Sequence, residues 1–461
     1  MYSFTRRELL SRAGMGVGML GLASVMHRGG LLAADASPRR LDFAPRAKRV
    51  IFLFMNGGPS HVDTFDPKPA LAKHVGQKPK GSNGQKVAAG FIPSPFAFAP
   101  HGKSGVVMSE LFPRLAERAD DLCVVRSMHT DVPNHEPGLI LMHSGVQQPV
   151  RPSMGSWVSY GLGTENENLP GFIVLAPRKP VVGPHLWSSS FLPGAYQGTA
   201  LDTADFAVDK LVANLRNPTI GRTDQREQLD LLGKLNAIHA ERRETNTAFD
   251  AQVKAMETAF RMQTDAAEAF DISRESPRTR DRYGHTNFGK QCLLARRLSE
   301  RGVRFVQAYY LDPKNNQPWD THANNNEGHR KLCADSDRAT AALLEDLKDR
   351  GLLDETLVVW TGEFGRTPYA QPVEKGGHGR DHHHTAFCTL LAGGGIKGGL
   401  MYGASDDVGM HAVENRVHIH DLHATILYLL GIDHEKLTFR YSGRDFRLTD
   451  VKGVVVKGVL A

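Results

Sequence analysis

The sequence has little cysteine and no cysteine motif. Its 461 residues include four cysteines, and no two of them are spaced as C-x-x-C. This absence excludes a zinc ribbon and a dithiol redox centre of the usual kind. The wide spacing leaves open whether two disulfides form in an oxidising compartment or whether the thiols stay free and buried. The four positions are Cys123, Cys292, Cys333 and Cys388.

The sequence also lacks an excess of positive charge outside its first 49 residues. The net charge is +6, but residues 1–49 hold nine of the 56 Lys and Arg residues and three of the 50 acidic residues. The rest of the chain therefore holds 47 residues of each sign. It contains no basic stripe and no aromatic platform, so nothing indicates nucleic-acid binding.

A twin-arginine pattern stands near the start of the chain, in the run TRRELL at residues 5–10. A weakly apolar segment at residues 14–26 and the small residues 34–36 follow it. This order predicts a twin-arginine export signal over residues 1–36, and hence a location in the periplasm or cell envelope. The apolar segment is short and rich in glycine, so we expect no transmembrane span in the mature chain. A merely basic N-terminus and an uncleaved anchor remain as alternatives.

After a linker at residues 37–48, short apolar runs alternate with longer amphipathic segments. The apolar runs are typical of buried strands, and the amphipathic segments are typical of helices. We predict strands at residues 49–55, 122–126, 171–175, 303–310, 357–360 and 385–391. We predict helices at residues 109–119, 134–143, 153–161, 289–301, 327–350 and 417–430.

This alternation predicts an α/β fold with a mostly parallel central sheet and helices on both faces. One domain would span residues 49–461. Residues 177–222 show little periodicity and are expected to form loops. Residues 224–285 are mainly polar and rich in helix-forming residues, which is typical of a helical insertion in the main domain.

Polar side chains stand next to several predicted strands, where a sheet places its ligands. Because neighbouring parallel strands end at the same edge of a sheet, we expect these side chains to converge. A mixed set of His, Asp, Glu and Asn suits a divalent metal such as zinc, manganese or calcium. The predicted metal ligands are Asn56, Asp320, His322, Glu363 and His382, and His135 opens a helix nearby.

Residues 378–384 contain four histidines and an aspartate. Such density is unusual without a ligand or a polar network, so a metal site is the favoured interpretation. The alternative is a solvated, hydrogen-bonded loop. Taken singly, a strand-end aspartate such as Asp320 is more often a turn residue, and a lone histidine such as His329 is more often structural.

Several runs of the sequence resemble the DUF1501 family of exported bacterial proteins. They are ARRLSERGVRFV at 295–306, WDTH at 319–322, GEFGRTP at 362–368, GRDH at 379–382, HDLHAT at 420–425 and GRD at 443–445. Residues 352–368 also resemble a strand of the sulfatase and alkaline phosphatase superfamily. The resemblance implies an alkaline-phosphatase-like α/β fold. For such a protein we expect an anionic small-molecule or glycan substrate.

The candidate site departs from that superfamily at two strand ends. The enzymes have an Asp where this chain has Asn56, and an Asp-His pair where it has Glu363-Phe364. Asp320 and His322 lie where the resemblance places an Asp-x-x-x-His metal pair, but their spacing is two, and His329 is an alternative. The ligand set of this chain would therefore differ from that of the enzymes.

The stretch at residues 135–145, HEPGLILMHSG, resembles the sulfatase motif C-x-P-x-R-x-x-x-L-T-G. His135 takes the place of the nucleophilic Cys, and Leu139 takes the place of the Arg. No formylglycine can form here, which excludes ordinary sulfatase chemistry at this position. His135 could be a metal ligand, a nucleophile or general base, or part of a site that binds without catalysis.

Arg366 and Arg380 could hold an anionic group through two parallel hydrogen bonds, or could form structural salt bridges with Asp381 or Glu363. The sequence favours an exported, metal-dependent hydrolase of a phosphate or sulfate ester, with His135 and Arg366 as candidate catalytic residues. The alternative is a catalytically silent protein that binds an anionic glycan or a partner in the same pocket.

Overall fold

The structure is a computed structural model that describes residues 41–79, 90–166, 168–212, 221–241, 260–261, 267–372 and 378–461. Its centre is a nine-stranded sheet with the order β12-β4-β11-β8-β1-β7-β5-β6, and β15 pairs with β4 beside this path. The strands are β1 (Arg49–Met55), β4 (Leu122–His129), β5 (Phe172–Ala176), β6 (Thr199–Asp202), β7 (Phe305–Tyr310), β8 (Thr356–Thr361), β11 (Phe387–Ala392), β12 (Leu400–Tyr402) and β15 (Val417–His418).

Strand β1 lies in the middle of this sheet, and every one of its residues is buried. It pairs in parallel with β7 on one side and with β8 on the other, so that Phe54 lies opposite Tyr309 and Thr361. A continuous apolar run is the expected sequence for a strand that is covered on both faces. The strand ends at Met55, and Gly57 and Gly58, both with positive φ, turn the chain at the edge of the sheet.

One strand runs against the others. Strand β11 is antiparallel to both of its neighbours, β4 and β8, whereas every other pairing within this sheet is parallel. The prediction of a mostly parallel α/β sheet is therefore confirmed, with β11 as the exception. Because of this reversal, β11 begins at the edge where β1, β4, β7 and β8 end.

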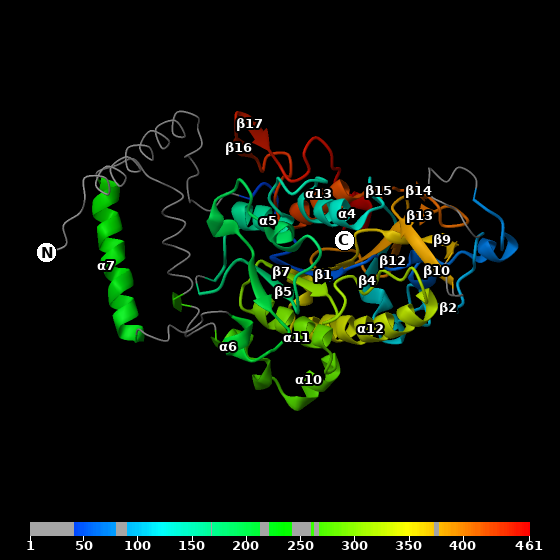
Figure 1. Cartoon of the computed structure of the whole chain (residues 1–461), viewed down its shortest axis with the longest axis horizontal. Helices are drawn as coiled ribbons and strands as arrows, with labels where there is room; N and C mark the ends of the chain where they lie inside the picture. Colours follow the sequence, from blue (N-terminus) through cyan, green and yellow to red (C-terminus); the bar gives the residue numbers. More distant parts are fainter. Residues whose placement is uncertain are drawn as a thin grey trace, which may run out of the picture.

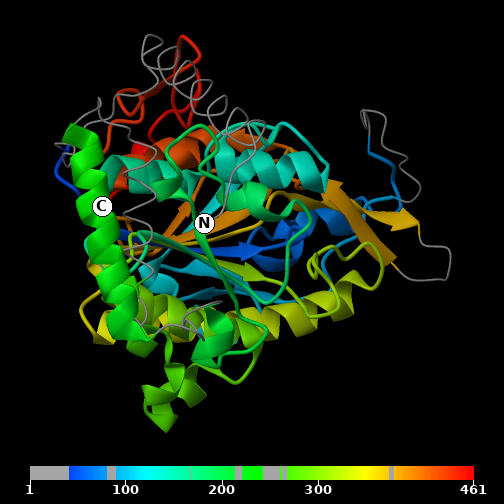
Figure 2. The same ribbon diagram turned by 60° about the vertical axis from the view of Figure 1, so that its left-hand side comes forward.

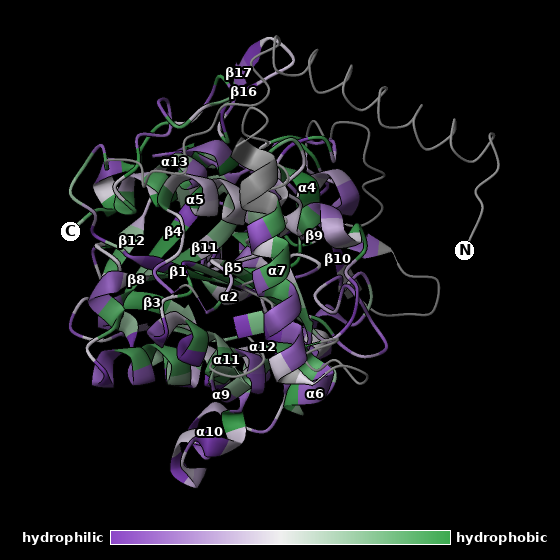
Figure 3. Ribbon diagram, turned by 90° about the vertical axis from the view of Figure 1, so that its left-hand side faces the viewer, coloured by the Kyte–Doolittle hydropathy of each residue, from purple (hydrophilic) through white to green (hydrophobic). Residues whose placement is uncertain are grey.

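Helices cover both faces of the sheet, as predicted (Figure 1). One face carries α4 (His135–Ser144), α5 (Met154–Leu162) and α13 (Ile419–Leu429), and the other carries α11 (Asn287–Glu300) and α12 (Asn325–Asp349). Alternate residues of β1 enter the two resulting cores: Phe52 and Phe54 pack on the first side, and Ile51 and Leu53 on the second. Figure 3 shows these inner strands mainly in the green of hydrophobic residues.

Two local predictions were wrong. Residues 109–119 do not form one helix: the chain forms β3 (Val106–Ser109), which pairs with β2 (Phe98–His101), and then the short α3 (Pro113–Ala116). Pro113 can begin a helix but cannot continue one, so the helix starts only there. The region expected to be loops contains β6, which extends the sheet beside β5.

A hairpin leaves the sheet between β8 and β11. Its strands are β9 (Gly365–Pro372) and β10 (His378–His383), which pair in antiparallel fashion. The remaining short elements are α2 (His61–Thr64), α6 (Val208–Leu211), α9 (Ala267–Phe270), α10 (Pro277–Tyr283), β13 (Ala404–Ser405), β14 (Ala412–Glu414), β16 (Phe439–Tyr441) and β17 (Arg444–Phe446).

Part of the predicted helical insertion is described. Helix α7 (Arg222–Glu241) stands apart from the layered body in Figure 1, and in Figure 2 it is seen in front of the body's left-hand side. The predicted signal at residues 1–36 lies outside the described residues. Within the described ranges, no helix is both long and apolar enough to cross a membrane. All four cysteines are buried and free, so neither possible disulfide forms.

Candidate metal centre

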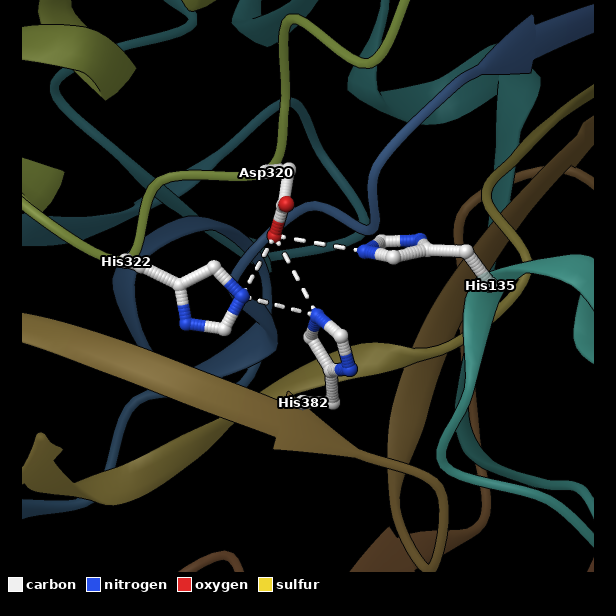
Figure 4. A group of neighbouring side chains, drawn as sticks. All are labelled: His135, Asp320, His322 and His382. Carbon is white, nitrogen blue, oxygen red and sulfur yellow. Dashed lines mark hydrogen bonds and ion pairs between the residues drawn. The ribbon is translucent and has the colours of Figure 1, made fainter. Parts of the chain in front are cut away.

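Four side chains with metal-ligating atoms meet at the edge of the sheet where β1, β4, β7 and β8 end. They are His135, Asp320, His322 and His382, and one ligand atom from each lies within 4.8 Å of all the others (Figure 4). His135 is the first residue of α4, and His382 belongs to β10. Asp320 and His322 lie in the loop between β7 and α12. Segments far apart in the sequence thus supply one compact group.

The carboxylate of Asp320 is the centre of this group. Its Oδ1 atom lies 2.9 Å from Nε2 of His322 and 3.3 Å from Nε2 of both His135 and His382. The Nε2 atoms of His322 and His382 are 2.9 Å apart. All three imidazoles therefore present the same ring nitrogen to the same small volume.

The opposite nitrogen of each imidazole contacts an oxygen outside the group. Nδ1 of His135 lies 2.7 Å from Oε1 of Glu363, and Nδ1 of His382 lies 2.7 Å from the carbonyl oxygen of Pro133. Nδ1 of His322 contacts Oε1 of Gln371. An Nδ1–H that donates to such an oxygen leaves the lone pair on Nε2, which is the usual arrangement of histidines that ligate a metal.

Glu363 does not belong to the group of four, although the sequence predicted it as a ligand. It follows β8, is fully buried, and accepts hydrogen bonds from the backbone nitrogen of Gly57 at 3.0 and 3.2 Å. Its third contact is the one to His135. The carboxylate therefore lies behind His135 and fixes the orientation of that ring.

Arg366 is fully buried and its donors are used within the protein. Nη2 lies 2.5 Å from Oδ1 of Asp320, and Nε donates to the carbonyl oxygen of Gly58 at 3.0 Å. Nη2 also contacts the carbonyl oxygen of Gly57, and Nη1 that of Arg380. The side chain therefore holds Asp320 against the turn that follows β1. It does not point a free pair of donors at a substrate.

Charges within the group shift the pKa values of its members. Burial raises the pKa of Asp320, but hydrogen bonds from the three histidines and the charge of Arg366 outweigh it and hold that pKa well below its usual range. Burial lowers the pKa of His135, but hydrogen bonds to Asp320 and Glu363 outweigh it and raise the pKa to about 9. The group therefore favours a positive charge beside these carboxylates, which a proton or a metal ion can supply.

Asn56 lies at the same edge and is fully buried. Its backbone oxygen accepts a hydrogen bond from the nitrogen of Trp319 at 3.0 Å, which joins the turn after β1 to the loop that carries Asp320. Its side chain donates to the carbonyl oxygen of Asn316 at 3.2 Å, while Oδ1 has no partner in the described parts of the chain. The structure thus places Asn56 beside the loop of the candidate ligands.

Three of the histidines at residues 378–384 have described side chains, and these three point to different places. Of the three, only His382 reaches the group, and His383 is bonded to the carbonyl oxygen of Met410 at 2.7 Å. His384 lines a separate cavity. The side chain of His378 lies outside the described residues.

His329, the alternative ligand, is buried on α12 and accepts a hydrogen bond from the nitrogen of Ser60 at 3.0 Å. The hydroxyl of Ser60 donates to Asp63 at 2.6 Å, and Asp63 in turn pairs with Arg380 at 2.8 Å. These residues form a buried structural network. Arg380 therefore makes a structural salt bridge, with Asp63 as its partner. Sequence reasoning did not find Gln371 or Pro133, because a contact partner across a hairpin or loop has no local signal.

The residues present fit a divalent transition metal. Three imidazole nitrogens and one carboxylate oxygen form a donor set that such ions accept. Nε2 of His135 is buried, and Asp320 Oδ1, at 3.3 Å, is its one close polar contact among the described residues. A metal ion held between this nitrogen and the carboxylate would satisfy both atoms.

The sheet and this site define an α/β protein with a His and Asp cluster that could hold a metal ion. The chain belongs to the family described as "Protein of unknown function (DUF1501)", which matches residues 47–460. The predicted family membership is therefore confirmed. No curated protein matches the chain.

Solved structures of a sulfatase, a lipoteichoic acid synthase and an alkaline phosphatase align with most of this chain. A sulfatase from Pseudoalteromonas sp. has 14% identity and a TM-score of 0.38, over 97% of this chain and 75% of that one. The lipoteichoic acid synthase LtaP from Listeria monocytogenes has 10% identity and a TM-score of 0.37, over 95% and 82%. An alkaline phosphatase from the Antarctic bacterium TAB5 has 11% identity and a TM-score of 0.37, over 83% of this chain and 98% of that one. The α/β class of this chain follows from its own sheet.

Proposed function

We propose that this chain is a zinc-dependent hydrolase of a phosphate or sulfate ester. The observation that carries the proposal is the geometry of three imidazoles. Each presents Nε2 to the carboxylate of Asp320, and each has Nδ1 engaged by an oxygen behind it. Metal ligands must direct their nitrogens at one point, whereas histidines with a purely structural role need not.

The donor set favours zinc among the metals considered from the sequence. Calcium prefers six or more oxygen ligands, and this group offers one carboxylate and three nitrogens. Zinc accepts nitrogen and carboxylate oxygen, and catalytic zinc sites in particular are rich in histidine. Bound there, a zinc ion would polarise an ester oxygen and lower the pKa of a water molecule.

The position of His135 supports the role of metal ligand over that of nucleophile. Its Nδ1 is bonded to Glu363 and its Nε2 faces Asp320, so neither nitrogen points away from the group. Ser60 is no substitute, because its hydroxyl is buried and donates to Asp63. We therefore propose that water attacks the ester directly and that the chain forms no covalent intermediate.

The choice of a phosphate or sulfate ester rests on sequence. Residues 352–368 and 135–145 resemble two motifs of the sulfatase and alkaline phosphatase superfamily. Both segments border the site, through Glu363 and Arg366 in the first and His135 in the second. Arg366 and Glu363 act in this proposal through Asp320 and His135, so they are positioning residues. The proposed substrate is an anionic small molecule or glycan.

We also propose that the protein is exported by the twin-arginine route to the periplasm or cell envelope. The support is the TRRELL run and the apolar segment that follows it. Replacing Arg6 and Arg7 by lysine should keep the protein in the cytoplasm of a producing cell, as measured by cell fractionation. Export of the double variant at the normal level would contradict the proposal.

The hydrolase proposal is tested by turnover of an aryl phosphate and an aryl sulfate with metal-stripped and zinc-reloaded protein. We expect activity only after reloading, and its loss in His382→Ala. The matched control is His285→Ala, which removes an exposed histidine of a surface ion pair and should leave turnover unchanged. Stoichiometric zinc without turnover of either ester would refute the enzyme and favour the silent binding protein.

A further inference from the structure

A cavity of about 440 Å³ lies next to the metal centre, and none of the four candidate ligands lines it. Its volume falls in the range of small-molecule sites. The exposed residues His411 and Arg416 form part of its wall, so it is open to solvent. The polar residues that the argument uses are His129, Thr130, Asp131, His384, His411 and Arg416.

The same two chain segments border the cavity and the metal centre. The backbone nitrogen of Thr130 donates to the carbonyl oxygen of His384 at 2.8 Å. A few residues away, Nδ1 of His382 contacts the carbonyl oxygen of Pro133 at 2.7 Å. The segment that follows β4 and the end of β10 therefore separate the two sites.

The lining offers hydrogen-bonding atoms that the protein does not use. Thr130 is only 4% exposed, yet its Oγ1 atom has no hydrogen-bond partner among the residues described. Because Thr130 lines the cavity, its unpaired hydroxyl is available to a bound molecule. The side chains of His384, His411 and Arg416 likewise make no hydrogen bond or ion pair to another described residue.

The charge of the lining favours a ligand with one anionic group. Asp131 is already engaged, since one carboxylate oxygen lies 3.2 Å from Nε2 of His418 and the other 3.3 Å from Nζ of Lys452. Burial, with the nearby charges of His418 and Arg416, lowers the pKa of His129 to about 4, so this ring is neutral at pH 7. Arg416 is then the permanent cation of the lining.

We propose that this cavity binds a sugar-sized polyhydroxy molecule that carries one phosphate, sulfate or carboxylate group. Arg416 holds the anionic group, and Thr130 with the imidazoles of His129, His384 and His411 binds the hydroxyls. Because no candidate metal ligand lines the cavity, this binding does not depend on the metal. The proposal therefore stands apart from the proposed hydrolase activity.

The test is calorimetric titration of metal-stripped protein with four probes: glucose 6-phosphate, glucose 6-sulfate, glucose and inorganic phosphate. We expect both anionic sugars to bind, and glucose and inorganic phosphate to bind at least about tenfold more weakly. No binding of any probe overturns the proposal. Equal binding of inorganic phosphate and glucose 6-phosphate overturns its sugar part, and equal binding of glucose overturns its anionic part.

Two variants locate the site. Arg416→Gln should weaken binding of glucose 6-phosphate at least about tenfold, whereas Arg278→Gln, which changes an exposed arginine on α10, should not alter it. Thr130→Val should weaken binding without lowering the melting temperature, because it replaces a buried, unpaired hydroxyl. Wild-type affinity in both Arg416→Gln and Thr130→Val would place the binding elsewhere and refute the assignment.

Discussion

Nδ1 of His135 lies 2.7 Å from Oε1 of Glu363, a carboxylate that is fully buried and held by the backbone of Gly57. This contact fixes the ring of His135 so that its other nitrogen faces Asp320. It also explains why an acid stands after β8 without joining the ligand group. Glu363 thus lies behind His135, a candidate ligand.

Replacing Glu363 by glutamine should lower zinc affinity by about 10- to 100-fold, which is the usual effect of losing an outer carboxylate. The amide keeps the size of the side chain and can still accept from His135, so the loss reports the missing charge. Competition with a chromophoric chelator measures the affinity. Unchanged affinity in Glu363→Gln would mean that this carboxylate does not tune the site.

Gly57 has a φ of 116°, and a Cβ atom built there would lie 2.3 Å from the backbone nitrogen of Asp320. Gly57→Ala should therefore displace Asp320, lower the free energy of unfolding by about 2–4 kcal/mol, and weaken zinc binding. Urea unfolding and chelator competition measure the two effects.

The matched control is Gly105→Ala, where φ is also positive at 72° but no atom lies within 4 Å of the added Cβ. It should cost only the backbone strain of about 1–2 kcal/mol and leave zinc affinity unchanged. If both variants lost zinc to the same extent, close packing against Asp320 could not be the cause.

Arg366 is fully buried and pairs with Asp320, so removing its charge leaves that carboxylate without the one permanent cation among its described contacts. Arg366→Met should lower the free energy of unfolding by about 3–5 kcal/mol in metal-free protein. Arg278→Met, at an exposed position, should change it by less than about 0.5 kcal/mol. Urea unfolding curves compare the two, and equal small losses would show that the buried pair is dispensable.

Because three of its histidines are buried, we expect the protein to lose stability as the pH falls. Burial lowers the pKa of His143 and His329 to about 4 and of His423 to about 3. Between about pH 6.5 and pH 4 the unfolded chain therefore binds protons that the folded chain does not. The free energy of unfolding should fall as pH falls, by about 1.4 kcal/mol per pH unit for each histidine.

Urea unfolding of metal-free protein at several values between pH 7 and pH 4.5 measures this slope. His423→Gln removes one titrating ring, whose Nε2 contacts the carbonyl oxygen of Met142. The variant will be less stable at pH 7, but its stability should depend on pH by about one proton less. An identical slope in wild type and variant would show that burial does not keep His423 neutral in the folded protein.

Much of the fold could be predicted because the signal is local. The apolar run that forms β1 and the proline-ended turn after it are plain in the sequence, and the strand has the predicted bounds, Arg49–Met55. The prediction of a helix at residues 109–119, with Ser109 as its cap, was wrong because Ser109 ends β3 and the helix begins only at Pro113. Strand β6 was missed because four residues carry almost no periodicity.

Less of the site could be predicted, because the pairing of strands across the sheet determines which side chains come together. Asp320 and His322 follow a parallel strand, so their place at the carboxyl edge could be expected. His382 reaches the same edge only because β11 is antiparallel to its neighbours, and the direction of a strand has no local signature. The positions of Glu363 and Arg366 behind the ligands depend on side-chain packing.

The most direct test of the account is the metal content of purified protein after zinc reloading, measured by mass spectrometry for wild type and for Asp320→Asn, His322→Ala and His382→Ala. The account predicts one equivalent of zinc per wild-type chain and less than about a tenth of that in each variant, with His285→Ala like wild type. A wild type that holds no zinc, or variants that keep a full equivalent, would contradict it.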